Sequence, residues 1–352
     1  MIPVSQPSIT DLEKKYVNEA LNDGWISSQG PHVKRFEEAW AKWNDVRYGV
    51  ACSSGTTAIQ IALEALNLNP GDEVIVPEFT MIATAWAVSA AGLTPVFVDC
   101  GNDLNIDVDK IEGVITKKTK VILPVHIYGR QCNMDAILDI AYEYNLRVIE
   151  DSAEAHGVKP RGDIACFSLF ANKIISAGEG GICLTNDKHL AEQMNHIKAM
   201  AFNKDHTFLH KKWGHNFRMT NLQAAFALAQ TERIDDILKK RKQIEGWYDE
   251  ELGGIKEITL MPKRNVLWMY DLLAENRNEL VAWLKKEGIE SRVFFKPMSQ
   301  QFMYRCEEQQ WESPQANHYA QRGLYLPSYT DIQKPDIDYI CDKIREFYDE
   351  VK

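Results

Sequence analysis

The sequence predicts an α/β protein whose main sheet is largely parallel and covered by helices on both faces. Short apolar runs alternate with amphipathic segments through the first half of the chain. Strands separated by helices in this way pair in parallel through right-handed crossovers. The chain has 352 residues, which exceeds the usual size of one hydrophobic core and predicts two domains.

The strands of this sheet are expected where the apolar runs are short and flanked by turn residues. They are residues 48–52, 73–76, 95–98, 120–123, 147–149, 165–168 and 181–184. Helices are expected where apolar residues recur every three or four positions. These are residues 57–66, 81–91, 134–144, 187–200 and a long stretch at 221–252.

The chain changes character after residue 252, where short strands and helices alternate again at 265–271, 279–287 and 291–295. We place the domain boundary within the long helix, near residue 240. This gives a large domain at 1–240, with the N-terminal segment, and a small C-terminal α/β domain at 241–352. No Ser/Gly linker separates them, so the two domains are expected to pack together.

Composition argues against several classes of protein. The formal net charge of -10 conflicts with nucleic-acid binding, which needs clustered Lys and Arg. The uncharged stretch 80–98 is broken by Thr94 and Pro95 and fits a helix followed by a strand better than a membrane span. Seven dispersed cysteines without a CxxC pair, and no visible secretory signal, predict reduced thiols and a cytoplasmic protein.

No metal site is predicted. His206 and His210 have the i, i+4 spacing of a helical metal pair, but they lie in a polar stretch without a third ligand. We expect a mobile loop there.

A lysine and an acidic strand end form the most informative pattern. Lys173 lies between Ser168 and the turn GEGG at 178–181, downstream of Glu150 and Asp151. This layout is typical of enzymes that use pyridoxal 5'-phosphate (PLP), where a lysine amine holds the cofactor as a Schiff base and a carboxylate pairs with the pyridine nitrogen. Asp151 alone could equally be a helix N-cap. The buried strands around Lys173 favour the cofactor role.

The turn after strand 48–52 is a candidate phosphate site. Residues 53–57 read SSGTT and open a helix, whose N–H groups and dipole attract an anion, and the hydroxyls of Thr56 and Thr57 can add hydrogen bonds. Such turns often only cap a helix. Neither a Walker lysine nor a complete GxGxxG is present.

Further motifs follow one order and spacing over nearly the whole chain. They are GWISSQGP at 24–31, PEFTMIAT at 77–84, PVHIYG at 124–129, EDSAEAHG at 150–157 and GHNFRMTN at 214–221. Together with the SGT turn and the Lys173 region, they resemble the DegT/DnrJ/EryC1/StrS family of PLP-dependent sugar aminotransferases. The resemblance implies PLP fold type I, as in aspartate aminotransferase, and a homodimer with shared active sites.

The resemblance also implies a role for each cofactor-binding position. Lys173 and Asp151 would be the catalytic pair, with Lys173 forming the Schiff base and moving protons. The phosphate would be bound by Gly55, Thr56 and Ser168, and by Asn216 of the neighbouring subunit. Glu154 would lie near the cofactor hydroxyl. Met81 stands where many members have an aromatic residue stacked on the cofactor, and a thioether can pack against the ring as well.

Segments 25–29 and 292–298 look closest to the branch that aminates C4 of nucleotide-linked 4-keto-6-deoxyhexoses, as in perosamine or viosamine formation. The implied reaction takes the amino group of L-glutamate, with pyridoxamine phosphate as intermediate, and gives a 4-amino-4,6-dideoxy sugar nucleotide for polysaccharide biosynthesis. The nucleotide could be GDP, UDP or dTDP. The expected substrate contacts are Trp25, Ser27, His126, Arg218, Phe295 and Lys296.

Several alternatives remain open at this point. Arg218 could form an ordinary structural salt bridge, and His126 could be a hydrogen-bonded core residue. Ser299 stands where many members carry a histidine near the sugar, which changes the expected sugar contacts. A C3 aminotransferase or a PLP-dependent deoxysugar dehydratase would share the fold, although the related dehydratase replaces the lysine with histidine. A DNA-binding regulator conflicts with the acidic composition.

Overall fold

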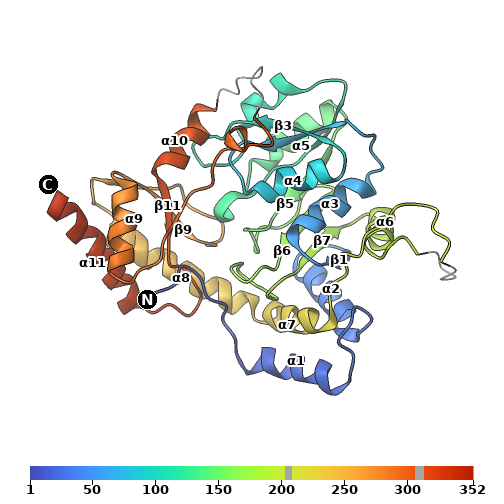
Figure 1. Ribbon diagram of the computed structural model, residues 1–352, viewed down its shortest axis with the longest axis horizontal. Helices are drawn as coiled ribbons and strands as arrows, with labels where there is room; N and C mark the ends of the chain where they lie inside the picture. The colour runs from blue at the N-terminus through green and yellow to red at the C-terminus, as the bar shows by residue number, and fades with distance from the viewer. Residues whose placement is uncertain (203–207, 306–312, 352) are drawn as a thin grey trace.

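Two β-sheets organise the chain in the computed structural model, which describes residues 1–202, 208–305 and 313–351 (Figure 1). The larger sheet has seven strands in the order β1-β7-β6-β5-β4-β2-β3, and the smaller has four in the order β10-β11-β9-β8. The larger sheet comprises β1 Tyr48–Cys52, β2 Glu73–Pro77, β3 Thr94–Val98, β4 Thr119–Ile122, β5 Arg147–Asp151, β6 Ile164–Ser168 and β7 Gly181–Thr185.

Most strands of the larger sheet are parallel, as the sequence predicts. Neighbours from β3 through β6 pair in parallel, whereas β7 is antiparallel to both β6 and β1. A parallel pair needs a long crossover, usually a helix, and an antiparallel pair does not. The β6–β7 connection contains no helix, so the chain simply turns back. This connection carries Lys173.

Helices cover both faces of the larger sheet because its strands are apolar on both sides. In β2, Val74 and Val76 join one apolar cluster, while Ile75 between them joins another. The first cluster includes residues of α3 Gly55–Ala65, α4 Ile82–Ala90, α6 Lys188–Lys198 and α7 Asn221–Glu232. The second is closed by α5 Met134–Glu143. The predicted strands and helices of this region are confirmed, with ends that differ by at most two residues.

The long helical stretch predicted at 221–252 is divided into two helices, α7 and α8 Ile234–Leu252. Arg233 between them has φ -103° and ψ 4°, which interrupts the helix. Ile237 packs with the larger apolar cluster, whereas Ile244 and Leu252 pack with a separate one. Helix α8 therefore passes from one core to the other around residue 240, where we predict the domain boundary.

The smaller sheet is antiparallel throughout and consists of β8 Ile258–Leu260, β9 Tyr270–Ala274, β10 Arg292–Val293 and β11 Gly323–Leu326. Its core is shared with α8, α9 Arg277–Lys286 and α11 Lys334–Val351. Both chain termini lie on this side of the molecule (Figure 1), where Ile2 forms a bridge to Ile289. The strand predicted at 265–271 begins only at Tyr270, because Trp268 and Met269 pack into the larger cluster.

The sequence patterns did not predict α1 Asp11–Asn22, α2 Pro31–Trp43, α10 Pro314–Arg322 or α11. A local signal was present for α1, because Thr10 and Glu13 form a capping box at its start.

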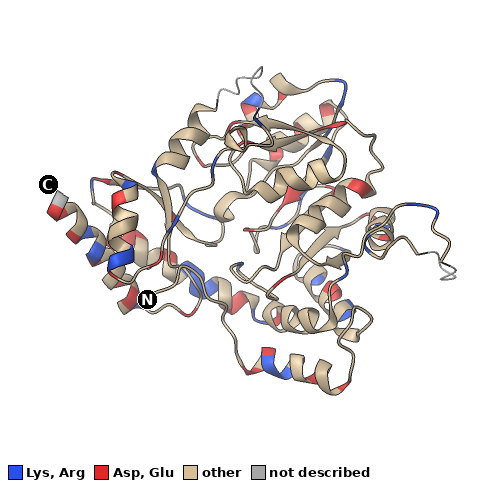
Figure 2. Cartoon of the chain, in the orientation of Figure 1, with Lys and Arg blue, Asp and Glu red and all other residues tan. Residues whose placement is uncertain are grey.

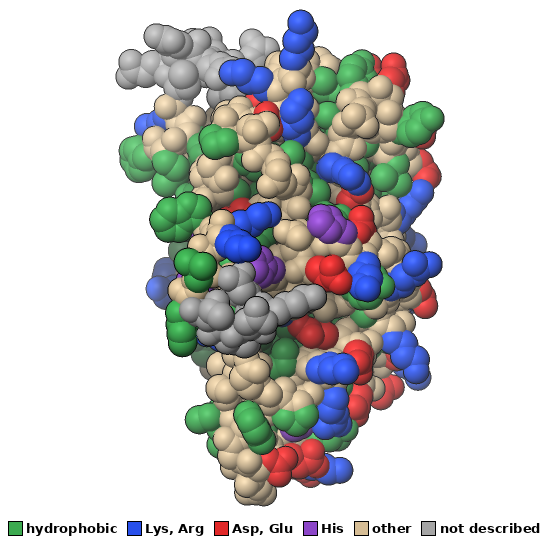
Figure 3. All heavy atoms as spheres, turned by 90° about the vertical axis from the view of Figure 1, so that its right-hand side faces the viewer, with side chains coloured by type: hydrophobic (Ala, Val, Ile, Leu, Met, Phe, Trp, Pro, Cys, Tyr) green, Lys and Arg blue, Asp and Glu red, His purple; other side chains and the backbone are tan. Residues whose placement is uncertain are grey.

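Charged side chains of both signs are distributed over the whole molecule (Figure 2). On the face shown in Figure 3, Lys and Arg lie among Asp and Glu rather than in one basic area. None of the helices in the described ranges combines the length and the apolar character that crossing a membrane would require.

Gly181 is required where β7 meets the start of α3. A Cβ at this position would overlap the carbonyl oxygen of Ser54. We expect Gly181→Ala to lower the free energy of unfolding by about 1–3 kcal/mol through overpacking. The exposed Gly246 in α8 is the matched control, because a Cβ there meets nothing within 4 Å.

Gly246→Ala should instead stabilise the protein by about 0.5–1 kcal/mol, since alanine favours a helix interior. Urea unfolding of both variants measures the difference. Equal effects in the two variants would contradict the close approach of β7 to Ser54.

Candidate active site

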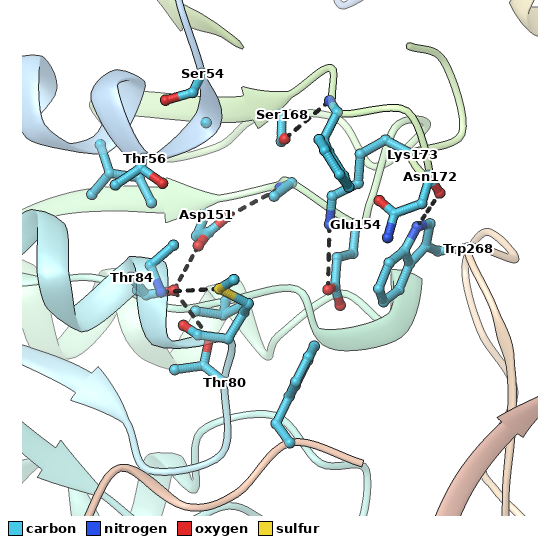
Figure 4. A pocket seen from close by; sticks show the side chains of 18 of the residues that line it. Ser54, Thr56, Thr80, Thr84, Asp151, Glu154, Ser168, Asn172, Lys173 and Trp268 are labelled. Carbon is cyan, nitrogen blue, oxygen red and sulfur yellow. Dashed lines mark hydrogen bonds and ion pairs between the residues drawn. The ribbon is translucent and has the colours of Figure 1, made fainter. Parts of the chain in front are cut away.

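A cavity of about 330 Å³ lies where the larger sheet meets the smaller unit (Figure 4). Strand ends and helix starts of the larger sheet form one side, and loops and β11 of the smaller unit form the other. A cavity of this size suits a small-molecule ligand. The lining includes Gly55, Thr56, Thr80, Met81, Thr84, Asp151, Glu154, Ser168, Lys173, Trp268, Phe295 and Tyr325.

Lys173 extends into this cavity from the β6–β7 connection (Figure 4). Its side chain is 10% exposed, and its Nζ lies 3.5 Å from Oε1 of Glu154. The ammonium also lies over the ring of Trp268, 4.2 Å from the ring centre. The indole Nε1 of Trp268 donates a hydrogen bond of 2.8 Å to the carbonyl of Asn172. The lysine is therefore held by a carboxylate on one side and a fixed aromatic ring on the other.

Asp151 is the last residue of β5 and is buried. Its Oδ2 accepts a hydrogen bond from the hydroxyl of Thr84 at 2.8 Å, and its Oδ1 accepts one from the N–H of Ala153 at 3.0 Å. Burial raises the pKa of Asp151, against the opposing effect of Lys173. A turn rather than a helix follows Asp151, so the N-cap interpretation is wrong.

Glu154 is the second buried carboxyl group of the cavity. Its Oε2 accepts a hydrogen bond of 2.9 Å from the N–H of Tyr128, and its Oε1 faces Lys173. Tyr128 has a φ of 51°, in the left-handed region, and its ring stacks against Trp268 and Phe295. The strained residue thus supports both the carboxyl group and the aromatic side of the cavity. Burial raises the pKa of Glu154 to about 7.

The start of α3 borders the cavity as an anion-binding terminus would. Ser54 and Thr57 form a reciprocal cap, in which Ser54 Oγ accepts from Thr57 N–H at 3.1 Å and Thr57 Oγ1 accepts from Ser54 N–H at 3.0 Å. The Thr57 hydroxyl is therefore engaged in capping, and Thr56 lines the cavity. A Cβ on Gly55 would lie 2.7 Å from the Cβ of Ser168. Because Gly55 has no side chain, the start of α3 can approach Ser168 closely, so Thr56 and Ser168 lie at the same end of the cavity.

Some residues that line the cavity had no predicted role. The hydroxyl of Thr84, which donates a hydrogen bond to Asp151, lies 3.0 Å from the hydroxyl of Thr80. The two are one helical turn apart in an otherwise apolar segment, a signal that sequence reasoning could have used. Met81, which is expected to pack on the cofactor, lines the cavity, and its sulfur accepts a hydrogen bond from the N–H of Ala83. Trp268 could not be found this way, because only the tertiary fold brings it to Lys173.

The predicted substrate contacts divide into two groups. Phe295 lines the cavity, and the adjacent Lys296 is exposed outside the lining. His126 has no exposed surface and does not line the cavity. Its Nε2 lies 2.8 Å from Glu150, and its Nδ1 accepts from the N–H of Cys132. The core-residue alternative for His126 thus fits the structure.

The other predicted residues lie away from the cavity of their own chain. Trp25, Ser27 and Asn216 are exposed, and Arg218 lines a second cavity of about 310 Å³ together with Gln29. Arg218 donates to the side-chain oxygen of Asn216 at 2.9 and 3.1 Å.

Of the two histidines considered as a metal pair, His206 lies outside the described residues. The exposed His210 contacts the carbonyl of Met200. Within residues 1–202, 208–305 and 313–351, no three His, Cys, Asp or Glu side chains gather as metal ligands.

The raised pKa of Glu154 predicts a pH-dependent stability. The ordinary pKa is 4.5 and the folded value about 7, so the folded protein binds this proton more tightly than the unfolded chain. The resulting stabilisation is full below pH 4.5 and is lost as the pH rises through 7. Between these limits, the free energy of unfolding of the cofactor-free protein should fall by on the order of 3 kcal/mol relative to Glu154→Gln. Urea unfolding of the wild type and of Glu154→Gln between pH 4.5 and 7 measures this difference. If the free energy of unfolding of both proteins changed in parallel with pH, the prediction would be wrong.

Comparisons with known proteins show the family to which the chain belongs. A family model described as the DegT/DnrJ/EryC1/StrS aminotransferase family matches residues 7–345. The GDP-perosamine synthase of Escherichia coli O157:H7 is 41% identical over 360 residues, which cover 99% of this chain and 98% of that protein. The GDP-perosamine synthase of Caulobacter vibrioides is 40% identical and covers 96% of each.

A solved structure shares the fold over the full length. The putative sugar aminotransferase Spr1654 from Streptococcus pneumoniae, in its PLP form, superposes with a TM-score of 0.91 at 27% sequence identity, covering 100% of this chain and 99% of that one. The predicted α/β architecture is thereby confirmed. The chain belongs to the DegT/DnrJ/EryC1/StrS aminotransferase family.

Proposed function

We propose that the protein is a PLP-dependent aminotransferase that moves the amino group of L-glutamate to C4 of a nucleotide-linked 4-keto-6-deoxyhexose. The observation that carries the proposal is the convergence of Lys173, Asp151 and the start of α3 on one cavity. An amine, a buried carboxylate and an anion-binding terminus are the three groups that PLP requires.

The residues of the cavity fit the cofactor. Thr56, Ser168 and the N-terminus of α3 would hold its phosphate, at the end where Gly55 leaves room. Asp151 would accept a hydrogen bond from the protonated pyridine nitrogen, and Met81 would pack on the ring. The buried carboxylate of Asp151 has Thr84 and Ala153 as its donors, so a cationic ring nitrogen would provide the charge partner that these neutral groups do not.

When bound, PLP supplies an electron sink for the carbon from which a proton is removed. Lys173 is the group in position to move that proton, because its Nζ lies inside the cavity beside Glu154. Glu154 and the Trp268 ring fix the position of the amine. Because Lys173 and Glu154 are largely buried, few water molecules can reach the reacting groups. This favours transfer of the amino group over side reactions.

The C4 regiochemistry is supported by the two GDP-perosamine synthases, which match nearly the full chain. We infer from their names that GDP is the preferred nucleotide of this protein. In the first half of the reaction glutamate gives up its amino group and its α-hydrogen and is released as 2-oxoglutarate, whose keto oxygen comes from water. In the second half the amino group and a hydrogen are added at C4, and the C4 carbonyl oxygen leaves as water.

We also propose that the working unit is a homodimer with shared active sites. Asn216 and Arg218 do not line the cavity of their own chain, although the family resemblance assigns them to cofactor and substrate. The exposed Asn216 and the half-buried Arg218, together with Trp25 and Ser27, would complete the cavity of a second copy.

The proposed function predicts a specific product. Purified protein with PLP, L-glutamate and a 4-keto-6-deoxyhexose linked to GDP should form one amino sugar nucleotide per 2-oxoglutarate, measured by mass spectrometry. The UDP- and dTDP-linked sugars should react more slowly. The variant Lys173→Ala should lower the rate at least about 10²-fold, since it removes the proton-transferring group. Absence of amination with all three nucleotides would defeat the proposal.

A further inference from the structure

A buried carboxylate just beyond the end of β2 holds a segment that is distant in the sequence. Glu78 has no exposed surface, and its Oε1 accepts hydrogen bonds from the N–H of Ser299, at 2.8 Å, and from the Ser299 hydroxyl. The carbonyl oxygen of Glu78 accepts a third bond from the N–H of Met298 at 3.0 Å. Glu78, which directly follows β2, therefore binds two consecutive residues of the segment 294–299.

The N–H and the hydroxyl of Ser299 stabilise a carboxylate whose surroundings are otherwise unfavourable for a charge. Its second oxygen, Oε2, is buried without a hydrogen-bond partner. Burial raises the pKa of Glu78, and none of the side chains that also act on this pKa, which are Ser299, Asp99 and Ser313, is a cation. A buried carboxylate depends on the few donors that it has. Loss of the Ser299 hydroxyl would weaken the attachment of the segment at this point.

The neighbouring strand end and an aromatic contact hold adjacent parts of the chain. Asp99 follows β3, and its Oδ1 accepts from the N–H of Ala316 at 3.0 Å, in the first turn of α10. Phe79, next to Glu78, contacts the rings of Phe294 and Phe295 at 5.7 and 6.1 Å between centres. Glu78 thus lies at the centre of the contact between the β2 and β3 ends and the C-terminal part of the chain.

The segment 294–299 contributes an apolar wall to the cavity through Phe295. Thr80 and Met81, which follow Glu78 closely in sequence, line the same cavity, whereas Glu78 and Ser299 do not. An aromatic ring suits the C–H face and the methyl group of a 6-deoxyhexose. The ring offers neither a positive charge nor a hydrogen-bond donor to the two carboxylates of glutamate. The wall is therefore suited to the sugar rather than to the amino donor.

We propose that Glu78 and Ser299 form a latch that positions Phe295 for the keto sugar, and that the latch governs sugar acceptance but not the donor half of the reaction. This inference rests on the proposed function. Both are positioning residues, because they act on the substrate through Phe295. Ser299 then acts on the sugar site through Phe295 without lining the cavity itself. It occupies the position where many members of the family carry a histidine.

Kinetics of the two halves of the reaction test the latch. The holoenzyme of Ser299→Ala should show a KM for the GDP-linked keto sugar raised about tenfold, the effect of losing a hydrogen bond to a carboxylate. The rate of the donor half, followed by the absorbance change of the bound cofactor on adding glutamate, should stay within about twofold of wild type. Ser299→Thr keeps the hydroxyl and is the matched control, with a KM near wild type. An equal loss in both halves, or an unchanged KM, would overturn the proposal.

Hydrogen exchange of the holoenzyme provides a second test that needs no sugar. A peptide covering residues 294–301 should exchange faster in Ser299→Ala and Glu78→Gln than in wild type, while the peptide containing Asp151 stays unchanged. Unchanged exchange at 294–301 in both variants would overturn the latch. If the wild-type enzyme reacts with glutamate but aminates no keto sugar, the proposed function fails, and the exchange result still decides whether the latch exists.

Discussion

Two buried carboxyl groups share one ammonium group at the floor of the cavity. Burial raises the pKa of both Asp151 and Glu154, and Lys173 opposes this rise in both. A single amine cannot neutralise two carboxylates in a site of low polarity. A further cation beside Asp151 would balance this charge, while Glu154 lies 3.5 Å from the Lys173 amine. This charge balance supports the proposed cofactor role beside the convergence of Lys173, Asp151 and the start of α3 on one cavity.

The topology of the larger sheet brings these groups together. Asp151 ends a parallel strand, and the start of α3 follows β1, so both lie where ligands bind in open α/β sheets. The reversal at β7 sends the β6–β7 connection across the same edge and places Lys173 there. The smaller unit closes the other side with Trp268 and Phe295. The contact of Glu78 with Ser299 is one of the points where the two parts are joined.

Local patterns predicted the larger sheet well, because its strands are short apolar runs separated by amphipathic helices. The layout of Lys173 and Asp151, typical of PLP enzymes, indicated a shared site, and both residues line the same cavity. Contacts made only by the tertiary fold escaped prediction: Trp268 reaches Lys173 from the smaller unit, and Ser299 bonds Glu78 from a distant segment. For His126, the motif did not reveal that buried Glu150 holds its ring in the core. Sequence spacing fixes which strand end carries a residue, but not which neighbours its side chain meets.

Lys173 is the residue that we propose to bind PLP. Reduction of the PLP-loaded protein with sodium borohydride, followed by proteolysis and mass spectrometry, locates the lysine that is joined to the cofactor. We expect the phosphopyridoxyl group on the peptide that contains Lys173, and no specific labelling in Lys173→Ala. A label on a different lysine, or an unlabelled Lys173 in protein saturated with PLP, would show that Lys173 does not hold the cofactor.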